Sequence, residues 1–293
     1  MINIKFPITK QFSNGYSIIF NKPIQEQSEA HLDDMIIEPG FLYALHGNNG
    51  IGKTTFMNIL SLLTDSVLMP FKNDNEIFFG QSQMDSDHIQ VSNKSLERHR
   101  NLSFIFQDPH IINIYTIEEN LKIINDSFNF DIHLDVIAEK VKALKLQEYS
   151  KQFVLKKLDK FKSERDDTPF YLSGGEKQLL SFIRCMIKPS NMIFADEPWA
   201  SMDKYLKEFI ESQLYLYIDD KDIFSDIRNE NKSLLNKKIV MIISHPVHHA
   251  NQAEQFGEII SDWAHYIPVS NENVDAYEGL QKLVLNKYRP VKR

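Results

Sequence analysis

The sequence predicts an α/β protein built around a mainly parallel sheet, and three observations lead to this fold class. Short apolar runs typical of buried strands occur at residues 41–46, 192–195 and 239–243. Segments whose apolar residues recur with helical spacing lie between these runs. A glycine-rich turn follows the first run and leads into a helical segment. Strands that alternate with helices in this way form a sheet that is covered by helices.

The composition is that of an ordinary globular protein with an acidic surplus. The chain has 293 residues, 42% of them hydrophobic, and a formal net charge of -7. This length suits one large domain, and the negative balance argues against a nucleic-acid partner. No apolar run approaches the roughly 18–20 residues that a membrane span needs, and no signal-peptide pattern is present. A membrane role would therefore require a membrane partner. Cys185 is the only cysteine, so no intrachain disulfide can form.

Further elements are expected around these runs. Strands are expected at residues 2–6, 16–20, 76–80 and 102–106, and at least once beyond residue 250. Helices are expected at residues 95–99, at several stretches between 116 and 160, and at 177–188, 204–217 and 276–287. Residues 219–238 are charged and are expected to form a loop.

A phosphate-binding turn follows the strand at residues 41–46. The turn matches the P-loop pattern and consists of Gly47, Asn48, Asn49, Gly50, Ile51, Gly52, Lys53 and Thr54, with Thr55 next in the following helix. Glycines let backbone N–H groups close around phosphate oxygens, and the helix N-terminus favours an anion. Lys53 is expected to reach the β- and γ-phosphates of a nucleotide, and the Thr54 hydroxyl is expected to bind Mg²⁺.

An acidic pair ends the strand at residues 192–195. Asp196 is placed to hold the Mg²⁺ shell, and Glu197 is placed to orient or deprotonate an attacking water. An acidic pair at a strand end is common by itself, but the P-loop upstream makes a catalytic role the preferred interpretation.

The order of these motifs resembles that of the ATP-binding cassette (ABC) ATPases. The matching segments are the P-loop, Phe106-Gln107-Asp108-Pro109, Leu172-Ser173-Gly174-Gly175-Glu176, Asp196-Glu197-Pro198, Ser201-Met202-Asp203 and Ser244-His245-Pro246. The resemblance extends from about residue 2 to about residue 268 and is greatest to the nucleotide-binding subunits of ABC transporters. It implies that the substrate is ATP, used with Mg²⁺.

The resemblance also implies a role for each matching residue. Gln107 would sense Mg²⁺ and the lytic water. His245 would bond the γ-phosphate and position Glu197. Ser173, Gly174 and Gly175 would contact the γ-phosphate that is bound to a second subunit, and Asp203 would lie at the dimer interface. The catalytic set is then Glu197, His245, Gln107 and Lys53, and the metal set is Thr54, Gln107 and Asp196.

The aromatic residue that stacks on adenine is open between two candidates. Family members carry it upstream of the P-loop, and residues 8–12 resemble that segment best. Phe12 is therefore the preferred candidate, with Tyr16 as its rival, because stacking on a base needs only an exposed ring face.

The resemblance implies the ABC ATPase fold: a P-loop NTPase core, an N-terminal antiparallel β subdomain and an inserted α-helical subdomain. We expect one domain over residues 1–293, with the core and β subdomain in 1–107 and 173–293 and the helical insertion in 108–172. Two departures from the family pattern are a charged insert at about 219–238 and Leu179 where many relatives carry Arg.

The function implied is the ATP-hydrolysing subunit of an ABC transporter. It would form a homodimer or heterodimer and would sit on the cytoplasmic face of the membrane, bound to a separate transmembrane permease. The alternative is a soluble ABC-type ATPase in DNA repair, defence or another non-transport process. Those relatives usually separate the P-loop from the second glycine motif by a long coiled coil, and no sustained heptads are present here. The transported substrate and its direction cannot be read from the sequence.

Overall fold

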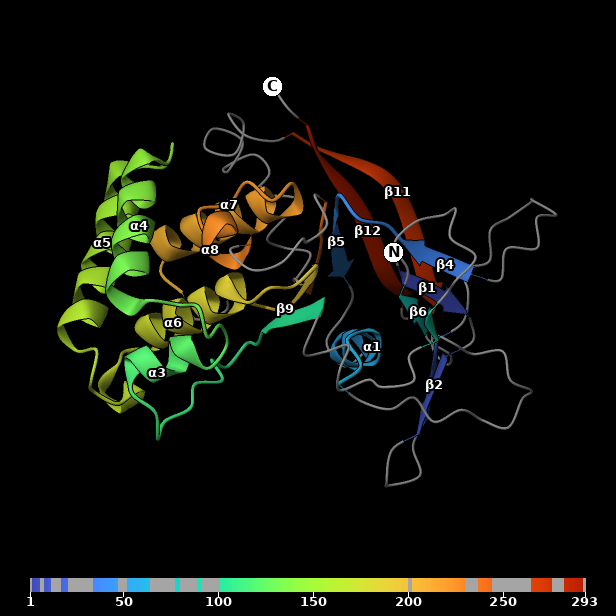
Figure 1. Ribbon diagram of the computed structural model, residues 1–293. Coiled ribbons are helices and arrows are strands. Elements are labelled where there is room, and N and C mark those ends of the chain that lie inside the picture. Colours follow the sequence, from blue (N-terminus) through green and yellow to red (C-terminus); the bar gives the residue numbers. More distant parts are fainter. Residues whose placement is uncertain are drawn as a thin grey trace.

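The computed structural model describes residues 2–5, 8–11, 17–20, 34–46, 52–63, 77–79, 89–90, 101–199, 202–229, 237–243, 265–275 and 282–291. Strands gather in one half of the molecule and most helices in the other (Figure 1). Every helix in the described part of the chain is too short or too polar to cross a lipid bilayer.

The largest sheet confirms the α/β prediction. Its strand order is β11-β12-β5-β10-β9-β8, and the four strands from β5 to β8 run parallel. These four are β5 (Phe41–His46), β10 (Ile239–Ile243), β9 (Met192–Asp196) and β8 (Leu102–Ile105). Their apolar runs follow from burial on both faces of the sheet.

An antiparallel sheet and a hairpin complete the β structure. The sheet has the order β4-β1-β6-β7, and the hairpin pairs β2 with β3. Their bounds are β1 Ile2–Lys5, β4 Asp34–Ile37, β6 Ile77–Phe79, β7 Ile89–Gln90, β2 Ile8–Gln11 and β3 Ser17–Phe20. The predicted N-terminal antiparallel β structure is confirmed. The sequence pattern did not predict β2 as a separate strand. The short helix expected at residues 95–99 lies outside the described residues.

The helix predicted near the end of the chain was wrong. Residues 276–287 were predicted to form a helix, whereas β12 is a strand over Lys282–Val291 and β11 is a strand over His265–Asp275. A short apolar run reads equally well as helix or strand, so tertiary pairing decides. Here β12 pairs antiparallel with both β11 and β5, which satisfies its backbone on both sides.

Three helices, α3, α4 and α6, begin at a residue whose side chain caps the helix N-terminus. Thr116 and Ser173 each form a reciprocal capping box with the Glu three residues later, and the Asn129 side chain caps α4. The bounds are α1 Lys53–Leu60, α3 Ile117–Lys122, α4 Phe130–Ala143, α5 Glu148–Ser163, the 3-10 turn η1 Pro169–Tyr171, α6 Gly174–Ile187, α7 Lys204–Ile218 and α8 Ser225–Asn229.

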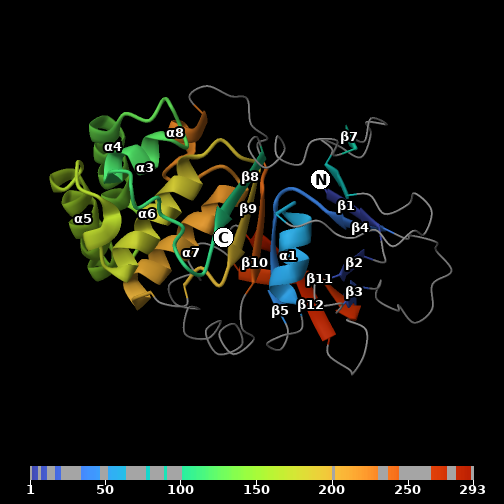
Figure 2. The same cartoon turned by 90° about the horizontal axis from the view of Figure 1, so that it is seen from below.

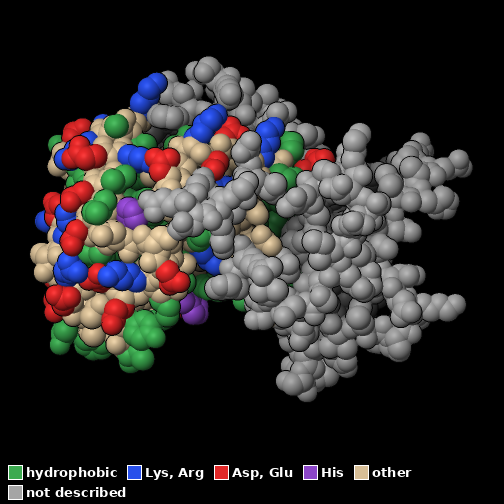
Figure 3. Space-filling view, viewed as in Figure 1, with side chains coloured by type: hydrophobic (Ala, Val, Ile, Leu, Met, Phe, Trp, Pro, Cys, Tyr) green, Lys and Arg blue, Asp and Glu red, His purple; other side chains and the backbone are tan. Residues whose placement is uncertain are grey.

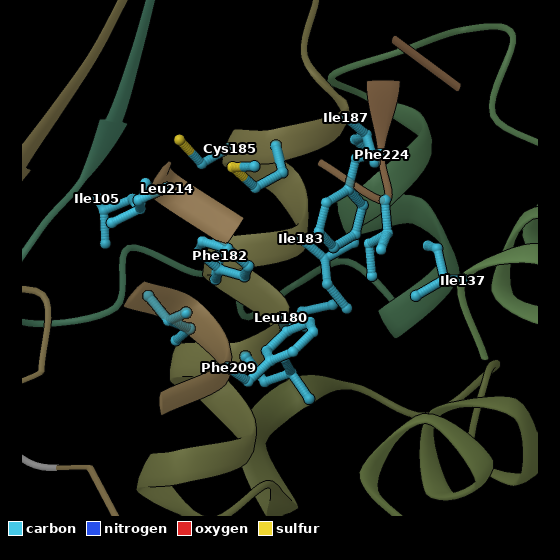
Figure 4. Close-up of a cluster of buried hydrophobic side chains, with 14 of the residues drawn as sticks. Ile105, Ile137, Leu180, Phe182, Ile183, Cys185, Ile187, Phe209, Leu214 and Phe224 are labelled. Carbon is cyan, nitrogen blue, oxygen red and sulfur yellow. The ribbon is translucent and has the colours of Figure 1, made fainter. Parts of the chain in front are cut away.

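The helices cover both faces of the parallel strands. Figure 2 shows α1 on one side of β8, β9 and β10, and α6 and α7 on the other. Acidic and basic side chains are interspersed over the helical half (Figure 3). Beneath this surface Phe182 on α6 packs edge-to-face against Phe209 and Phe224, with ring centroids 5.9 Å apart in both pairs (Figure 4). This cluster joins α6 to α7 and to the segment before α8.

The charged insert at residues 219–238 is partly ordered by a buried ion network, rather than being only a loop. The Arg228 side chain is 0% exposed and bonds Asp222 at 2.6 Å and Asp220 at 2.7 Å. It also donates to the Met186 carbonyl near the end of α6 at 2.7 Å. Lys238, which precedes β10, pairs with the same Asp220. Arg228 therefore satisfies a carbonyl of the last turn of α6 and ties the insert to the core.

The pKa of Asp220 shows the balance in this network. Burial opposes the charged carboxylate, but hydrogen bonds from Lys238 and Arg228 outweigh burial and lower the pKa below 3.8. A lowered carboxyl pKa stabilises the fold above the unfolded-state value, and this contribution is lost as the pH falls through the lowered value.

Replacing Arg228 by Met should lower the free energy of unfolding by about 3–5 kcal/mol, because the Asp222 carboxylate is left buried without its partner. Chemical denaturation at neutral pH measures the loss. The control is Lys142→Met, which removes an exposed ion pair with Glu139 and should leave the unfolding midpoint unchanged. Equal midpoints for both variants would contradict the role given to Arg228.

Candidate functional site

The first part of the site is the N-terminus of α1. β5 ends at His46 and α1 begins at Lys53, so the described part of the turn is Gly52. Gly52 has a φ of 101°, a left-handed conformation that favours glycine. Its carbonyl accepts the first helical bond from Phe56 N–H at 2.8 Å. Lys53 follows it, with 7% of its surface exposed. A helix N-terminus beside a lysine is suited to binding phosphate.

The second part is the acidic end of β9. The Thr54 hydroxyl donates to Asp196 Oδ2 at 3.0 Å, which joins the first turn of α1 to this strand end. Glu197 follows with a φ of 42°, unusual for a residue with a side chain. Its N–H bonds the Ile243 carbonyl at 3.2 Å, at the end of β10. Such strained backbone is found preferentially at functional sites.

The pKa shifts show how burial and charge oppose each other in this group. Burial raises the pKa of Asp196; Glu197 adds to the rise, while Thr54 and Lys53 oppose it. Burial lowers the pKa of Lys53 against the opposing pull of Glu197 and Asp196. The Lys53 ammonium thus interacts with both carboxylates, and a further cation beside Asp196 would favour the ionised form of Asp196.

The third part is the N-terminus of α6. Ser173 accepts from Glu176 N–H at 3.4 Å, and the Glu176 carboxylate accepts from Ser173 N–H at 2.8 Å. Gly174 is exposed, and a Cβ built there would meet nothing within 4 Å. A Cβ on Gly175 would make only ordinary contacts, the shortest being 3.8 Å. Packing among the described residues therefore does not require glycine at either position. Glycine also forms helices poorly, so helix stability does not explain the two glycines either.

Gln107 lies just beyond β8 and is exposed. Its carbonyl accepts a hydrogen bond from the Gln178 amide at 2.7 Å, and the nearby His110 carbonyl accepts one from Arg184 at 2.7 Å. Both donors are on α6. The loop that carries Gln107 is therefore attached to the helix that begins at Ser173.

The structure brings some of the predicted residues together and leaves others apart. Thr54, Asp196, Lys53 and Glu197 form one group. Asp203 lies at the other group, because its Oδ2 would be 3.9 Å from a Cβ on Gly175. Thr55 is in the first turn of α1. The predictions for Phe12, Tyr16, Gly47, Asn48, Asn49, Gly50, Ile51 and His245 lie outside the described residues.

From the sequence, no role was predicted for three residues near the α6 N-terminus, although Glu176 was part of a matching segment. Glu176 closes the capping box and pairs with Lys160 on α5 at 2.9 Å, and Gln178 holds the Gln107 carbonyl. The serine-x-x-glutamate spacing of a capping box could have revealed Glu176. No sequence signal points to Lys160 or to the Gln178 contact, because both depend on how the helices pack.

Comparison with known proteins agrees with this geometry. Residues 33–200 match the family model described as ABC transporter. The chain belongs to the ABC transporter family.

Two relatives illustrate the match. The lipoprotein-releasing system ATP-binding protein LolD of Ehrlichia canis is 30% identical over 202 residues, which cover 69% of this chain and 80% of that protein. The lipoprotein-releasing system ATP-binding protein LolD 2 of Chlorobaculum tepidum is 28% identical over 175 residues, 58% of this chain and 62% of that protein.

A solved structure supports the fold. A dimeric ATP-binding cassette in a post-hydrolysis state, bound to ADP and Pi, superimposes with a TM-score of 0.53 and 19% identity. The match covers 85% of this chain and 89% of that one. The protein is an ATP-binding cassette of the ABC transporter class.

Replacing Lys53 by Ala should weaken ATP binding about 100-fold or more, because charge-assisted hydrogen bonds to phosphate are lost. The fold should survive, since the change removes a buried ammonium whose pKa burial already lowers. Titration with a fluorescent ATP analogue measures binding, and thermal unfolding checks the fold. A folded variant that binds ATP normally would contradict the assignment.

Proposed function

We propose that the chain hydrolyses ATP at a site completed by a second cassette and thereby powers a separate membrane-spanning subunit. One observation carries this proposal: the chain has two helix N-termini suited to binding phosphate, and these are not joined to each other. Within the described residues, neither Ser173 nor the two glycines bonds to the group of Lys53, Thr54 and Asp196. One nucleotide would then use the α1 end of one chain and the α6 end of another.

On the P-loop side, Lys53 and the α1 N-terminus hold the terminal phosphates of ATP. Glu197 orients a water whose oxygen attacks the γ-phosphorus, and the bond from that phosphorus to the β–γ bridging oxygen breaks. The water proton passes to Glu197 or to the departing phosphate, giving ADP and inorganic phosphate. His245 is proposed to bond the γ-phosphate. Ile243 lies two residues before it, and the Ile243 carbonyl contacts Glu197 N–H at 3.2 Å.

The residues present fit a bound Mg²⁺. Thr54 Oγ1 and Asp196 Oδ2 are 3.0 Å apart, and hard oxygen donors are the ligands that Mg²⁺ prefers. The raised pKa of Asp196 is the shift expected where a cation is needed for the ionised form. We propose Thr54, Asp196 and the Gln107 side chain as its protein contacts. The ion would neutralise charge on the β- and γ-phosphates.

On the opposite side, Ser173, Gly174 and Gly175 of the second chain contact the γ-phosphate. Gly174 and Gly175 support this role, because no contact among the described residues requires a glycine there and a phosphate needs close approach to the backbone. Asp203, whose Oδ2 would lie 3.9 Å from a Cβ on Gly175, is proposed to lie at the same interface. Hydrolysis removes the γ-phosphate that joins the two chains, which loosens the dimer.

An exposed hydrophobic surface supports a membrane subunit as partner. Ile114, Phe170 and Tyr171 are 84%, 69% and 79% exposed. Their segments lie side by side, since Ile117 N–H bonds the Asp167 carbonyl at 3.0 Å. Figure 3 shows hydrophobic side chains gathered at the lower edge of the helical half. Exposed apolar clusters mark interaction sites.

In the chain, Ile114 follows the Gln107 loop, and Phe170 and Tyr171 precede the start of α6. A partner bound to this surface would therefore contact segments that lead to both. The relatives are named as ATP-binding proteins of a lipoprotein-releasing system. We therefore place the cassette on the cytoplasmic face of a membrane, held by a permease. The proposed domain division, with residues 108–172 inserted into a core of 1–107 and 173–293, gives this surface to the insertion.

Glu197→Gln should bind Mg·ATP, fail to hydrolyse it and accumulate as a dimer, because the γ-phosphate link persists. Sedimentation with ATP, ADP or no nucleotide measures this. The matched control, Lys53→Ala with Glu197→Gln, should stay monomeric under all three conditions. A Glu197→Gln chain that binds ATP but remains monomeric would overturn the shared site.

Replacing Phe170 and Tyr171 together by Ser should abolish capture of a polytopic membrane protein from native membranes, while ATP binding is retained. The reason is that the substitutions remove two exposed aromatic rings from the hydrophobic surface. Affinity capture with mass spectrometry measures the loss. The control is Tyr149→Ser, since Tyr149 is 76% exposed but lies on α5, away from this surface. Undiminished capture by the double variant would contradict the surface assignment.

A further inference from the structure

A lysine of α5, Lys157, lies beside the N-terminus of α6 and belongs to none of the recognised motifs. A Cβ built on Gly175 would lie 3.8 Å from Nζ of Lys157, which is closer than any other atom outside the local chain. Lys157 is on α5, one turn before Lys160. The packing of α5 beside α6 thus brings an ammonium group to the second glycine of the signature.

The charge of Lys157 is available for a ligand. Among the residues that the structure describes, Lys157 makes no ion pair, and its ammonium lies 4.6 Å from the centre of the Phe153 ring. Lys160, by contrast, is engaged by Glu176 at 2.9 Å. Contact with the Phe153 ring directs the Lys157 side chain without neutralising its charge.

A cation near Gly175 would offset the negative charge of the Asp203 carboxylate. Glu176 is matched by Lys160, whereas Asp203 places a second carboxylate oxygen 3.9 Å from the same Cβ position. A γ-phosphate that approaches the two glycines would be repelled by Asp203. Among the residues that the structure describes, Lys157 is a cation near this glycine with no ion-pair partner, and its Nζ lies 3.8 Å from the Cβ position of Gly175. An ammonium so close to a helix N-terminus can bind a phosphate that approaches the glycine N–H groups.

We propose that Lys157 is a further ATP-binding residue that acts across the dimer. Its ammonium binds the γ-phosphate of the ATP held by the P-loop of the second chain, together with Ser173 and the glycine N–H groups. The inference rests on the proposed shared site and deepens it. Since ADP has no γ-phosphate, Lys157 contributes to selecting ATP over ADP for dimer formation. Binding of ATP to a single chain does not involve Lys157.

The test uses Lys157→Met in the Glu197→Gln chain, with the ATP concentration for half-maximal dimerisation as the readout. The expected change is about a tenfold increase, the equivalent of one charge-assisted hydrogen bond. Lys157→Arg keeps the charge and should restore most of the loss. The control is Lys156→Met, because Lys156 is the exposed neighbour on the same helix. ATP binding by the monomer should be equal in all variants.

The outcomes separate this inference from the proposed function. If the parent Glu197→Gln chain does not dimerise with ATP, the shared site itself fails. If the parent dimerises and Lys157→Met matches it, only the role of Lys157 is overturned. Adding Asp203→Asn distinguishes the mechanism: rescue of Lys157→Met would mean that Lys157 merely neutralises Asp203, which also overturns the proposal. Circular dichroism verifies folding, and Lys157→Gln replaces the Met variant if that variant is unfolded.

Discussion

The register of four parallel strands is the constraint on which the site depends. Ile243 of β10 pairs with Leu45 of β5 on one side and with Asp196 of β9 on the other. Parallel strands deliver their carboxyl ends to one edge of the sheet, and ligands bind at that edge. The turn after β5, the acidic pair after β9 and the segment after β10 therefore leave the sheet together. The Thr54–Asp196 hydrogen bond is a direct result of this alignment.

Helix α6 carries the second helix N-terminus that we propose contacts ATP. Its first turn presents the bare glycines, its middle holds the Gln107 loop through Gln178, and its last turn is fastened by Arg228. All three contacts are made by the same helix, whose apolar face is buried against α7 (Figure 4). A shift of α6 would therefore change all three together. We infer that the charged insert, through Arg228 and Asp222, fixes the far end of this helix, which would otherwise end with unsatisfied carbonyls.

Much of this could be predicted from the sequence because local patterns coincide with the physics of the fold. Buried parallel strands are continuous apolar runs, and the helices from α3 to α7 have apolar stripes, with side-chain caps on α3, α4 and α6. The strand β12 was missed since its pattern is compatible with a helix and only pairing with β5 decides it. Lys157, Lys160 and the Gln178 contact could not be found, because each depends on interhelical packing. The positive φ of Glu197 likewise has no sequence signal.

The central claim is that one nucleotide is held by two chains, and photolabelling tests it most directly. A tagged Lys53→Ala chain, unable to bind ATP itself, is mixed with an untagged Glu197→Gln chain and an ATP analogue whose photoreactive group is attached to the γ-phosphate. The account predicts labelling of the tagged chain at residues 173–175 or 157, and only when the untagged chain is present. Labelling confined to the untagged chain would show that ATP is bound within a single subunit and would contradict the account.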